Sequence, residues 1–359
     1  MSYKYTHFIP QNIAPKGTNQ IGVYDSNGNK VCSIPLGRLK APTKEKLYSF
    51  GLVSDIHLFG REPSWLGNTK FDNALSYFED VNCEFCIVTG DLTQTGFYLR
   101  TDENTAGTEY LDEAQMAKYK EICDKHTIPV YELAGNHESY YNQDLTKNIT
   151  KWETYTGKDV ISYTVTYGND LFILLGQSSA SAVMSDSDFN WFSGLLESNK
   201  NKRCFVFVHS YIEEDSGDAK DYRENSIFDS WGTAKTTAFI NLLKQYNNVI
   251  LFHGHSHIKF ECQELDKNAT YTEKNGFKSV HIPSLGRPRN IDESAETTPY
   301  EDSESQGYIV DVYDDCIVLN GMDLIDNIPI ALGTYKIDTP LQTIPAGTFT
   351  DNTGTITIL

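Results

Sequence analysis

The stretch Leu-Tyr-Ser-Phe-Gly-Leu-Val-Ser-Asp-Ile-His, residues 47–57, joins a strand-forming run to two metal-binding side chains. Its apolar first part, residues 47–53, is typical of a short buried strand. Asp55 and His57 follow at once, and two residues two apart in an extended segment point to the same side. We therefore expect this strand to end in a pair of side chains that can hold one ion.

The same organisation, a strand-forming run that ends in Asp, Asn or His, recurs four times. These further blocks are Gly90-Asp91, Gly135-Asn136-His137-Glu138, His209 and Gly254-His255-Ser256-His257. Because the functional residues of α/β sheets gather at the carboxyl ends of strands, we expect all five blocks to meet at one edge. Together they supply seven candidate ligands and one spare histidine, His137. The candidate ligands are Asp55, His57, Asp91, Asn136, His209, His255 and His257.

Each block taken alone also has an ordinary explanation. A lone Asp after a strand is often a helix N-cap, a lone Gly-Asp or Gly-Asn is usually a turn, and His209 could be a core histidine. The joint occurrence of five such blocks makes these explanations improbable as a set. A shared carboxylate such as Asp91 can hold two ions roughly 3.5–4 Å apart, the spacing used in phosphate ester cleavage. Mixed nitrogen and oxygen ligands favour transition metals such as Mn, Fe or Zn over Ca or Mg alone.

Alternating apolar patterns along the chain predict strands and helices in turn. Strands are expected at residues 47–53, 85–88, 130–133, 204–208 and 249–252, and helices at 69–81, 111–123, 189–196 and 234–246. Antiparallel hairpins are expected at 21–34, 161–175 and 308–319, and a long polar loop at 96–108. Parallel units combined with hairpins favour two packed sheets flanked by helices over one doubly wound sheet.

Composition limits the class of protein and its partners. The 359 residues are 39% hydrophobic and 12% aromatic, which indicates a globular chain. A net charge of −19 argues against duplex nucleic acid as a partner, because such binding relies on Lys and Arg. The seven cysteines suggest no disulfide framework, and Cys83 and Cys86 are expected to pack in the core rather than to bind zinc. Neither a hydrophobic leader nor an apolar run of roughly 18 residues is visible, so we expect a cytoplasmic protein without a membrane partner.

In type, spacing and order, the five blocks resemble the pattern D-x-H, G-D, G-N-H-[DE], H and G-H-x-H of the calcineurin-like metallophosphoesterase superfamily. This resemblance implies an α/β fold, a four-layer αββα sandwich of two mixed β-sheets flanked by helices. The expected organisation is an N-terminal β-hairpin extension and linker at 1–45, a metallophosphoesterase domain at 46–325 and a C-terminal β-rich tail at 326–359. The first two blocks have a weaker likeness to the bacterial cyclic-nucleotide phosphodiesterase-like branch.

The resemblance also implies two divalent or trivalent transition-metal ions, with Mn, Fe or Zn as the expected elements. One metal would be held by Asp55, His57, Asp91 and His257, and the other by Asp91, Asn136, His209 and His255. A hydroxide that bridges the ions would attack phosphorus, and His137 resembles the non-ligand histidine that protonates the leaving oxygen or stabilises the transition state. The implied function is a metal-dependent phosphohydrolase that acts on a small phosphate-ester substrate, either a phosphodiester or a phosphomonoester.

Several residues near the blocks each allow two interpretations. Glu138 either orients a neighbouring group or is an acid in the first turn of a helix. His253 either supports the metal ligands or is a buried strand histidine. Arg287 and Arg289 either hold a phosphate or belong to a solvated loop. Gln94 stands where the purple acid phosphatases have a tyrosine, so no tyrosinate–iron colour is expected.

The competing function belongs to another class: a binding or structural module of a larger surface or particle assembly that carries a phosphoesterase-like domain. The N-terminal hairpin and the tail at 339–359 would then attach the domain to that assembly. Loss of a ligand would favour this interpretation, but all seven candidate ligands are present. The sequence predicts neither the physiological substrate nor the oligomeric state.

Overall fold

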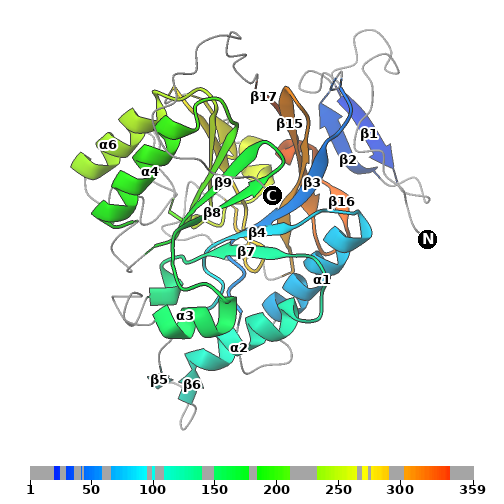
Figure 1. The fold of residues 1–359 in the computed structure, drawn as a ribbon. Helices are drawn as coiled ribbons and strands as arrows, with labels where there is room; N and C mark the ends of the chain where they lie inside the picture. Colours follow the sequence, from blue (N-terminus) through cyan, green and yellow to red (C-terminus); the bar gives the residue numbers. More distant parts are fainter. Residues whose placement is uncertain are drawn as a thin grey trace.

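The computed structural model of the chain shows two β-sheets packed face to face, with helices on both outer sides (Figure 1). The part of the chain that it describes comprises residues 20–24, 30–35, 42, 44–58, 66–94, 99–101, 109–139, 149–177, 184–210, 233–264, 269–273, 276–290 and 303–339. The predicted α/β sandwich of two mixed sheets is thereby confirmed.

The first sheet has seven strands in the order β16-β15-β14-β3-β4-β7, and β17 also pairs with β15. Its strands are β3 (Tyr48–Val53), β4 (Cys86–Thr89), β7 (Val130–Leu133), β14 (Gln306–Val312), β15 (Cys316–Asp323), β16 (Ile328–Pro329) and β17 (Tyr335–Asp338). β3, β4 and β7 are parallel, whereas β14 pairs with β3 and β15 in antiparallel register. Because both faces of this sheet are covered, β3 and β4 are apolar runs rather than alternating ones.

The second sheet has six strands in the order β12-β13-β11-β10-β9-β8. Its strands are β8 (Tyr163–Tyr167), β9 (Asp170–Leu175), β10 (Cys204–Val208), β11 (Val249–His253), β12 (Tyr271–Thr272) and β13 (Lys278–His281). β9, β10, β11 and β13 are parallel, and β8 forms the predicted antiparallel hairpin with β9. The carboxyl ends of β10 and β11 therefore lie side by side.

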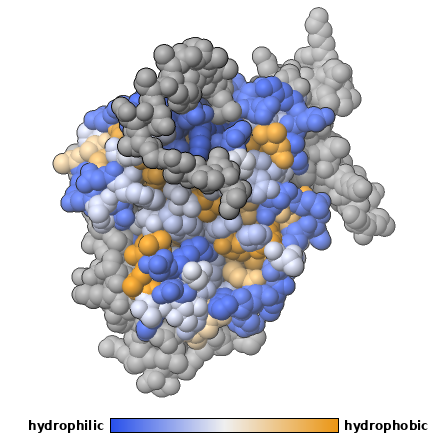
Figure 2. Space-filling view, in the orientation of Figure 1, coloured by the Kyte–Doolittle hydropathy of each residue, from blue (hydrophilic) through white to orange (hydrophobic). Residues whose placement is uncertain are grey.

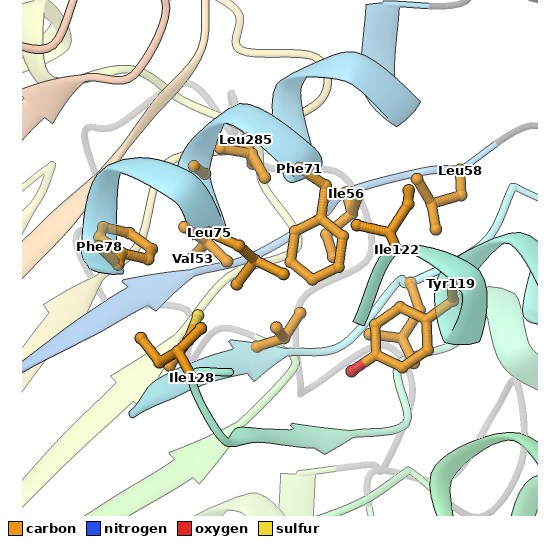
Figure 3. Packing of buried hydrophobic residues seen from close by; sticks show 14 of the residues in the cluster. Val53, Ile56, Leu58, Phe71, Leu75, Phe78, Tyr119, Ile122, Ile128 and Leu285 are labelled. Atoms are coloured by element: carbon orange, nitrogen blue, oxygen red, sulfur yellow. The ribbon is translucent and has the colours of Figure 1, made fainter. Parts of the chain in front are cut away.

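Helices pack on the outer face of each sheet. The seven-stranded sheet carries α1 (Leu66–Asp80), α2 (Asp112–Cys123) and α3 (Ile149–Thr156), and the six-stranded sheet carries α4 (Asp186–Ser198) and α6 (Thr233–Leu243). On α1, Phe71, Leu75 and Phe78 recur at helical spacing and are fully buried against Val53 of β3 (Figure 3). Burial of such side chains stabilises the fold by roughly 1.5–3 kcal/mol each.

Aromatic rings fill the space between the two sheets. Phe172 and Phe205 of the six-stranded sheet stack with centroids 4.7 Å apart, and Phe50 of β3 meets Phe172 edge-on at 5.4 Å. At the margin of this core, the buried Arg203 guanidinium donates two hydrogen bonds to Asp170, at 3.0 and 2.6 Å. The Tyr48 hydroxyl of the opposite sheet donates to the same carboxylate, so this ion pair joins the two sheets.

Some elements differ from the predictions because they are too short for a periodic pattern. The predicted loop at 96–108 contains the strand β5 (Leu99–Thr101), which pairs with β6 (Glu109–Leu111). No prediction covers the helix α3 or the strand β12. The predicted N-terminal hairpin is present as β1 (Gln20–Tyr24) and β2 (Lys30–Pro35). β16 and β17, which lie in the predicted C-terminal tail, pair with β15, and the division into three segments stays a prediction.

The described surface is largely hydrophilic on the face shown in Figure 2. Large apolar side chains are exposed at separate elements, at Leu47, Val160, Trp191 and Ile325. Cys83 and Cys86 are buried free thiols, and burial raises the pKa of Cys83 to about 12, as expected for packing residues. None of the helices in the described ranges is both long and apolar enough to cross a membrane.

Candidate metal centre

The five sequence blocks meet at the carboxyl ends of five parallel strands, three from one sheet and two from the other. β3, β4 and β7 lead into the first three blocks, and β10 and β11 lead into His209 and the His255-Ser256-His257 turn. Backbone hydrogen bonds join the blocks within each sheet: Asp55 N–H donates to the Gly90 carbonyl at 3.1 Å, and Gly254 N–H donates to the His209 carbonyl at 3.0 Å. The predicted convergence at one edge is therefore present.

A first group of four buried side chains could hold one ion. Asp55, His57, Asp91 and His257 each place a ligand atom within 4.8 Å of the others. His57 Nε2 lies 3.0 Å from His257 Nε2, and His257 Nε2 lies 3.2 Å from Asp55 Oδ1. This is the set that the resemblance implied for the first metal.

A second group shares one carboxylate with the first. Asp91, His209 and His255 also place ligand atoms within 4.8 Å of one another. His209 Nε2 lies 3.0 Å from Asp91 Oδ2 and 3.1 Å from His255 Nδ1. Asp91 thus belongs to both groups, as a bridging carboxylate must.

Asn136, the remaining predicted ligand, is half-buried in the loop that follows β7. Its two neighbours both contact Asp91. A Cβ on Gly135 would lie 2.2 Å from Asp91 Oδ1, and the backbone N–H of His137 donates to that oxygen at 2.9 Å. The loop therefore packs against the shared carboxylate, which only glycine permits at position 135.

The tautomers of two histidines show that the site suits a cation. His209 donates Nδ1–H to the Thr89 carbonyl at 2.8 Å, and His257 donates Nδ1–H to the Arg287 carbonyl at 2.9 Å. In each neutral ring the Nε2 lone pair then points into the cluster, toward a carboxylate oxygen or another imidazole. Asp55 Oδ1 is buried and accepts no hydrogen bond from the described residues. Converging lone pairs of this kind repel one another unless a positive charge lies among them, so these residues fit metal ions.

The pKa shifts within the cluster also indicate a site that favours positive charge. Burial opposes a charge on His209, but Asp91 and Asp55 outweigh it and raise the pKa of this imidazole to about 10. Burial and the charge of His209 lower the pKa of His255 to about 3. The two carboxylates thus favour positive charge at the position of His209 Nε2, and a metal ion supplies that charge when the imidazole is neutral.

A family model for calcineurin-like phosphoesterases matches residues 48–259, more than half of the chain. The chain belongs to the calcineurin-like phosphoesterase family. The match begins at β3 and ends just after His257, so it includes all five blocks.

Solved structures resemble this member of the family in fold. A dimetal phosphatase from Danio rerio is 12% identical, with a TM-score of 0.55, over 83% of this chain and 100% of that one. GAP50, described as the anchor in the inner membrane complex of Plasmodium, is 13% identical, with a TM-score of 0.51, over 84% of this chain and 91% of that one. No curated protein sequence matches the chain. At these identities the likeness shows the fold alone.

Backbone strain occurs at five of the seven candidate ligands. Asp55, His57, Asp91, His255 and His257 all have φ between 49° and 71°, in the left-handed region that side-chain-bearing residues seldom adopt. The expectation that Asp55 and His57 lie in an extended segment is therefore wrong, although both reach the same ion site. Such strain persists only where surrounding contacts hold it, and it is typical of functional sites.

Glu138 is one of the residues near the blocks for which the sequence allows two interpretations. Its buried carboxylate accepts hydrogen bonds from the backbone N–H groups of Asp91, Gly135 and Thr93 at 3.1, 2.8 and 3.0 Å, and from the Thr93 hydroxyl at 3.1 Å. Burial and the charge of Asp91 raise its pKa to about 7. Glu138 therefore orients a neighbouring loop, and its place in the short 3₁₀ helix His137–Ser139 is secondary.

His137 differs from the other histidines of the site in its exposure. Its side chain is 20% exposed, whereas that of His209 is fully buried. His137 Nδ1–H donates to the Gln94 carbonyl at 2.6 Å, and Nε2 lies 3.8 Å from Asp91 Oδ2. The ring therefore stands at the rim of the cluster with Nε2 directed to the shared carboxylate.

Sequence reasoning missed the supports that lie far away along the chain. The Ser284 hydroxyl donates to the Asp55 carbonyl at 2.8 Å. The buried Lys70 of α1 donates to the Gly286 carbonyl at 2.6 Å. No local pattern marks these residues, because each acts on a partner that only the fold brings near.

Proposed function

We propose that this chain is a metal-dependent phosphohydrolase that cleaves a phosphodiester or a phosphomonoester. The observation that carries the proposal is Asp91, a buried carboxylate common to two groups of ligand atoms. One ion would be held by Asp55, His57, Asp91 and His257, and the other by Asp91, Asn136, His209 and His255. When bound, two such ions polarise phosphoryl oxygens and lower the pKa of a coordinated water.

The metals that this donor set favours are Mn, Fe or Zn. The groups combine imidazole nitrogens with carboxylate oxygens, and no cysteine belongs to either group among the described residues. Ligands of this mixed kind suit borderline transition metals, whereas an all-oxygen set would suit Ca or Mg.

His137 acts as the general acid for the leaving oxygen. The Gln94 carbonyl keeps a proton on Nδ1, so Nε2 is the atom that gains and gives up a proton during the reaction. This atom lies beside the shared carboxylate at the partly exposed rim, where a phosphate ester can enter. General acid catalysis of this kind contributes typically about 10²–10⁴-fold to turnover.

A structural module is the second candidate function. GAP50, which shares the fold, is described as an anchor, and that description favours an assembly role for some proteins of this architecture. An assembly role does not require strained, buried imidazoles and carboxylates to converge on one point. Their retention here supports the enzyme.

Metal analysis and ester hydrolysis test this proposal together. The purified chain is loaded with Mn and assayed with bis(p-nitrophenyl) phosphate and p-nitrophenyl phosphate. We expect bound metal and hydrolysis of at least one ester. A chain that binds metal but cleaves neither ester would favour the structural role, and a chain that binds no transition metal would refute the proposed centre.

A further inference from the structure

Two side chains outside the ligand groups, those of Gln94 and Arg287, meet at the rim of the site. Arg287 Nη1 lies 3.5 Å from Gln94 Oε1. Each residue is also bonded to a different site histidine through its backbone carbonyl, Gln94 to His137 Nδ1 at 2.6 Å and Arg287 to His257 Nδ1 at 2.9 Å. The pair therefore connects the histidine at the rim with a histidine of the first ligand group.

The backbone of both residues is held in place. Gln94 N–H donates to the buried Gln115 Oε1 at 2.9 Å. Arg287 N–H donates to the Ser284 hydroxyl at 2.8 Å, and the preceding Gly286 N–H donates to the Asp55 carbonyl at 3.1 Å. Arg287 is accordingly half-buried on a fixed segment, and the solvated-loop interpretation does not describe it.

The two arginines of this segment have different tasks. Arg289 is 8% exposed and donates Nε–H to the Ser256 carbonyl at 2.8 Å, while its backbone N–H donates to the His257 carbonyl at 2.9 Å. It supports the turn that carries His255 and His257. Arg287 instead directs its guanidinium toward Gln94 beside the partly exposed His137.

The orientation of the His137 ring relates Gln94 and Arg287 to the proposed reaction. Nε2 of the ring faces Asp91, whereas Nδ1 donates to the backbone carbonyl of Gln94, the residue whose side chain contacts Arg287. A leaving group that accepts a proton from Nε2 would need to extend past the ring to contact this pair. A guanidinium carries five N–H donors in a plane and binds phosphoryl oxygens in pairs.

We propose that Arg287 and Gln94 bind a second phosphoryl group, carried by the leaving group, so that the substrate class is a diphosphate-linked ester. This inference rests on the proposed function. In the reaction a P–O bond to the water oxygen forms and the P–O bond to the bridging oxygen breaks. The second phosphoryl group departs with the bridging oxygen, which takes up a proton from His137. The attacking water releases one proton to solvent, and solvent returns one proton to His137.

The experiment compares substrates with and without a second phosphoryl group. Mn-loaded wild type, Arg287→Ala and Arg287→Lys are assayed with ADP and with bis(p-nitrophenyl) phosphate, after metal content and thermal melting are measured. Calorimetry with α,β-methylene-ADP and with AMP gives binding separately from turnover. Lys200→Ala, which removes one positive charge from an exposed site that pairs with Glu197, is the matched control.

Arg287→Ala is expected to lower kcat/KM for ADP and the affinity for α,β-methylene-ADP by about tenfold to a hundredfold, the range for a charge-assisted hydrogen bond. The same variant is expected to change kcat/KM for bis(p-nitrophenyl) phosphate and the affinity for AMP by less than about threefold. Arg287→Lys is expected to retain part of the preference for ADP over bis(p-nitrophenyl) phosphate, and Lys200→Ala is expected to retain all of it.

Three results overturn the inference: equal losses on both substrates, no loss on ADP, or a wild type that cleaves the diester but not ADP. These are distinct from failure of the proposed function itself, in which the wild type cleaves none of the esters. If Arg287→Ala melts well below the wild type, the losses on ADP and on bis(p-nitrophenyl) phosphate are compared in Arg287→Lys instead.

Discussion

Glu138 accepts the backbone N–H of Asp91 at 3.1 Å, while its other carboxylate oxygen accepts two hydrogen bonds from Thr93. The acidic residue after His137 thus fixes the loop that carries the shared carboxylate. Asp91 and Thr93 lie 47 and 45 positions away from Glu138 in the sequence, so these contacts exist only in the folded chain.

Glu138→Gln is expected to weaken metal binding by about 10–100-fold, the usual effect of removing a partner that orients a ligand. An amide NH₂ would replace one of the two acceptor oxygens and face either the N–H groups of Asp91 and Gly135 or the N–H group of Thr93. Titration calorimetry with the metal measures the change in affinity. Glu121→Gln, at an exposed position on α2, is the control, and equal affinities for the two variants would contradict the role of Glu138.

His137→Ala is expected to lower kcat by about 10²–10⁴-fold with little change in metal content, because a general acid is lost and no ligand is removed. The comparison uses p-nitrophenyl and alkyl esters of the same phosphate. The alkyl ester has the poorer leaving group and should suffer more. Normal turnover of the alkyl ester would exclude His137 as the general acid.

Arg203→Met is expected to destabilise the fold by roughly 3–5 kcal/mol, the cost of leaving a buried ion uncompensated. Arg203 is the bidentate partner of Asp170 and also donates to the Tyr313 carbonyl at 2.7 Å, in the opposite sheet's hairpin. Urea unfolding measures the loss. The double variant with Asp170→Asn should recover part of it, whereas strictly additive losses would show that the pair does not couple.

Glu79 makes the stability of the α1–α2 region depend on pH in the acidic range. Hydrogen bonds from His126 and Thr127 lower the pKa of this carboxyl from 4.5 to about 2. A lowered folded-state pKa means that the contribution of Glu79 is fully present above 4.5 and disappears as the pH falls toward 2. The stability difference between wild type and Glu79→Gln should therefore shrink below pH 4.5 in urea unfolding series. A difference that stays constant from pH 6 to pH 3 would contradict the assignment.

The sequence predicted where the ligands lie because each follows a strand-forming run, and parallel strands deliver their carboxyl ends to one edge. It could not predict how Asp55 is held. Asp55 has a positive φ and contacts distant groups, since its Oδ2 accepts the backbone N–H of His255 and its carbonyl accepts the hydroxyl of Ser284. Nor could it predict that Arg287 contacts Gln94, because these residues lie 193 positions apart in the sequence.

The measurement that tests the account most directly is the number of transition-metal ions per chain in the wild type and in Asp91→Ala, by elemental analysis after Mn loading and desalting. Because Asp91 belongs to both ligand groups, we predict two ions per wild-type chain and fewer than one in the variant. Lys200→Ala should retain both ions. Two ions in Asp91→Ala, or none in the wild type, would contradict the shared-carboxylate centre on which the proposed phosphohydrolase rests.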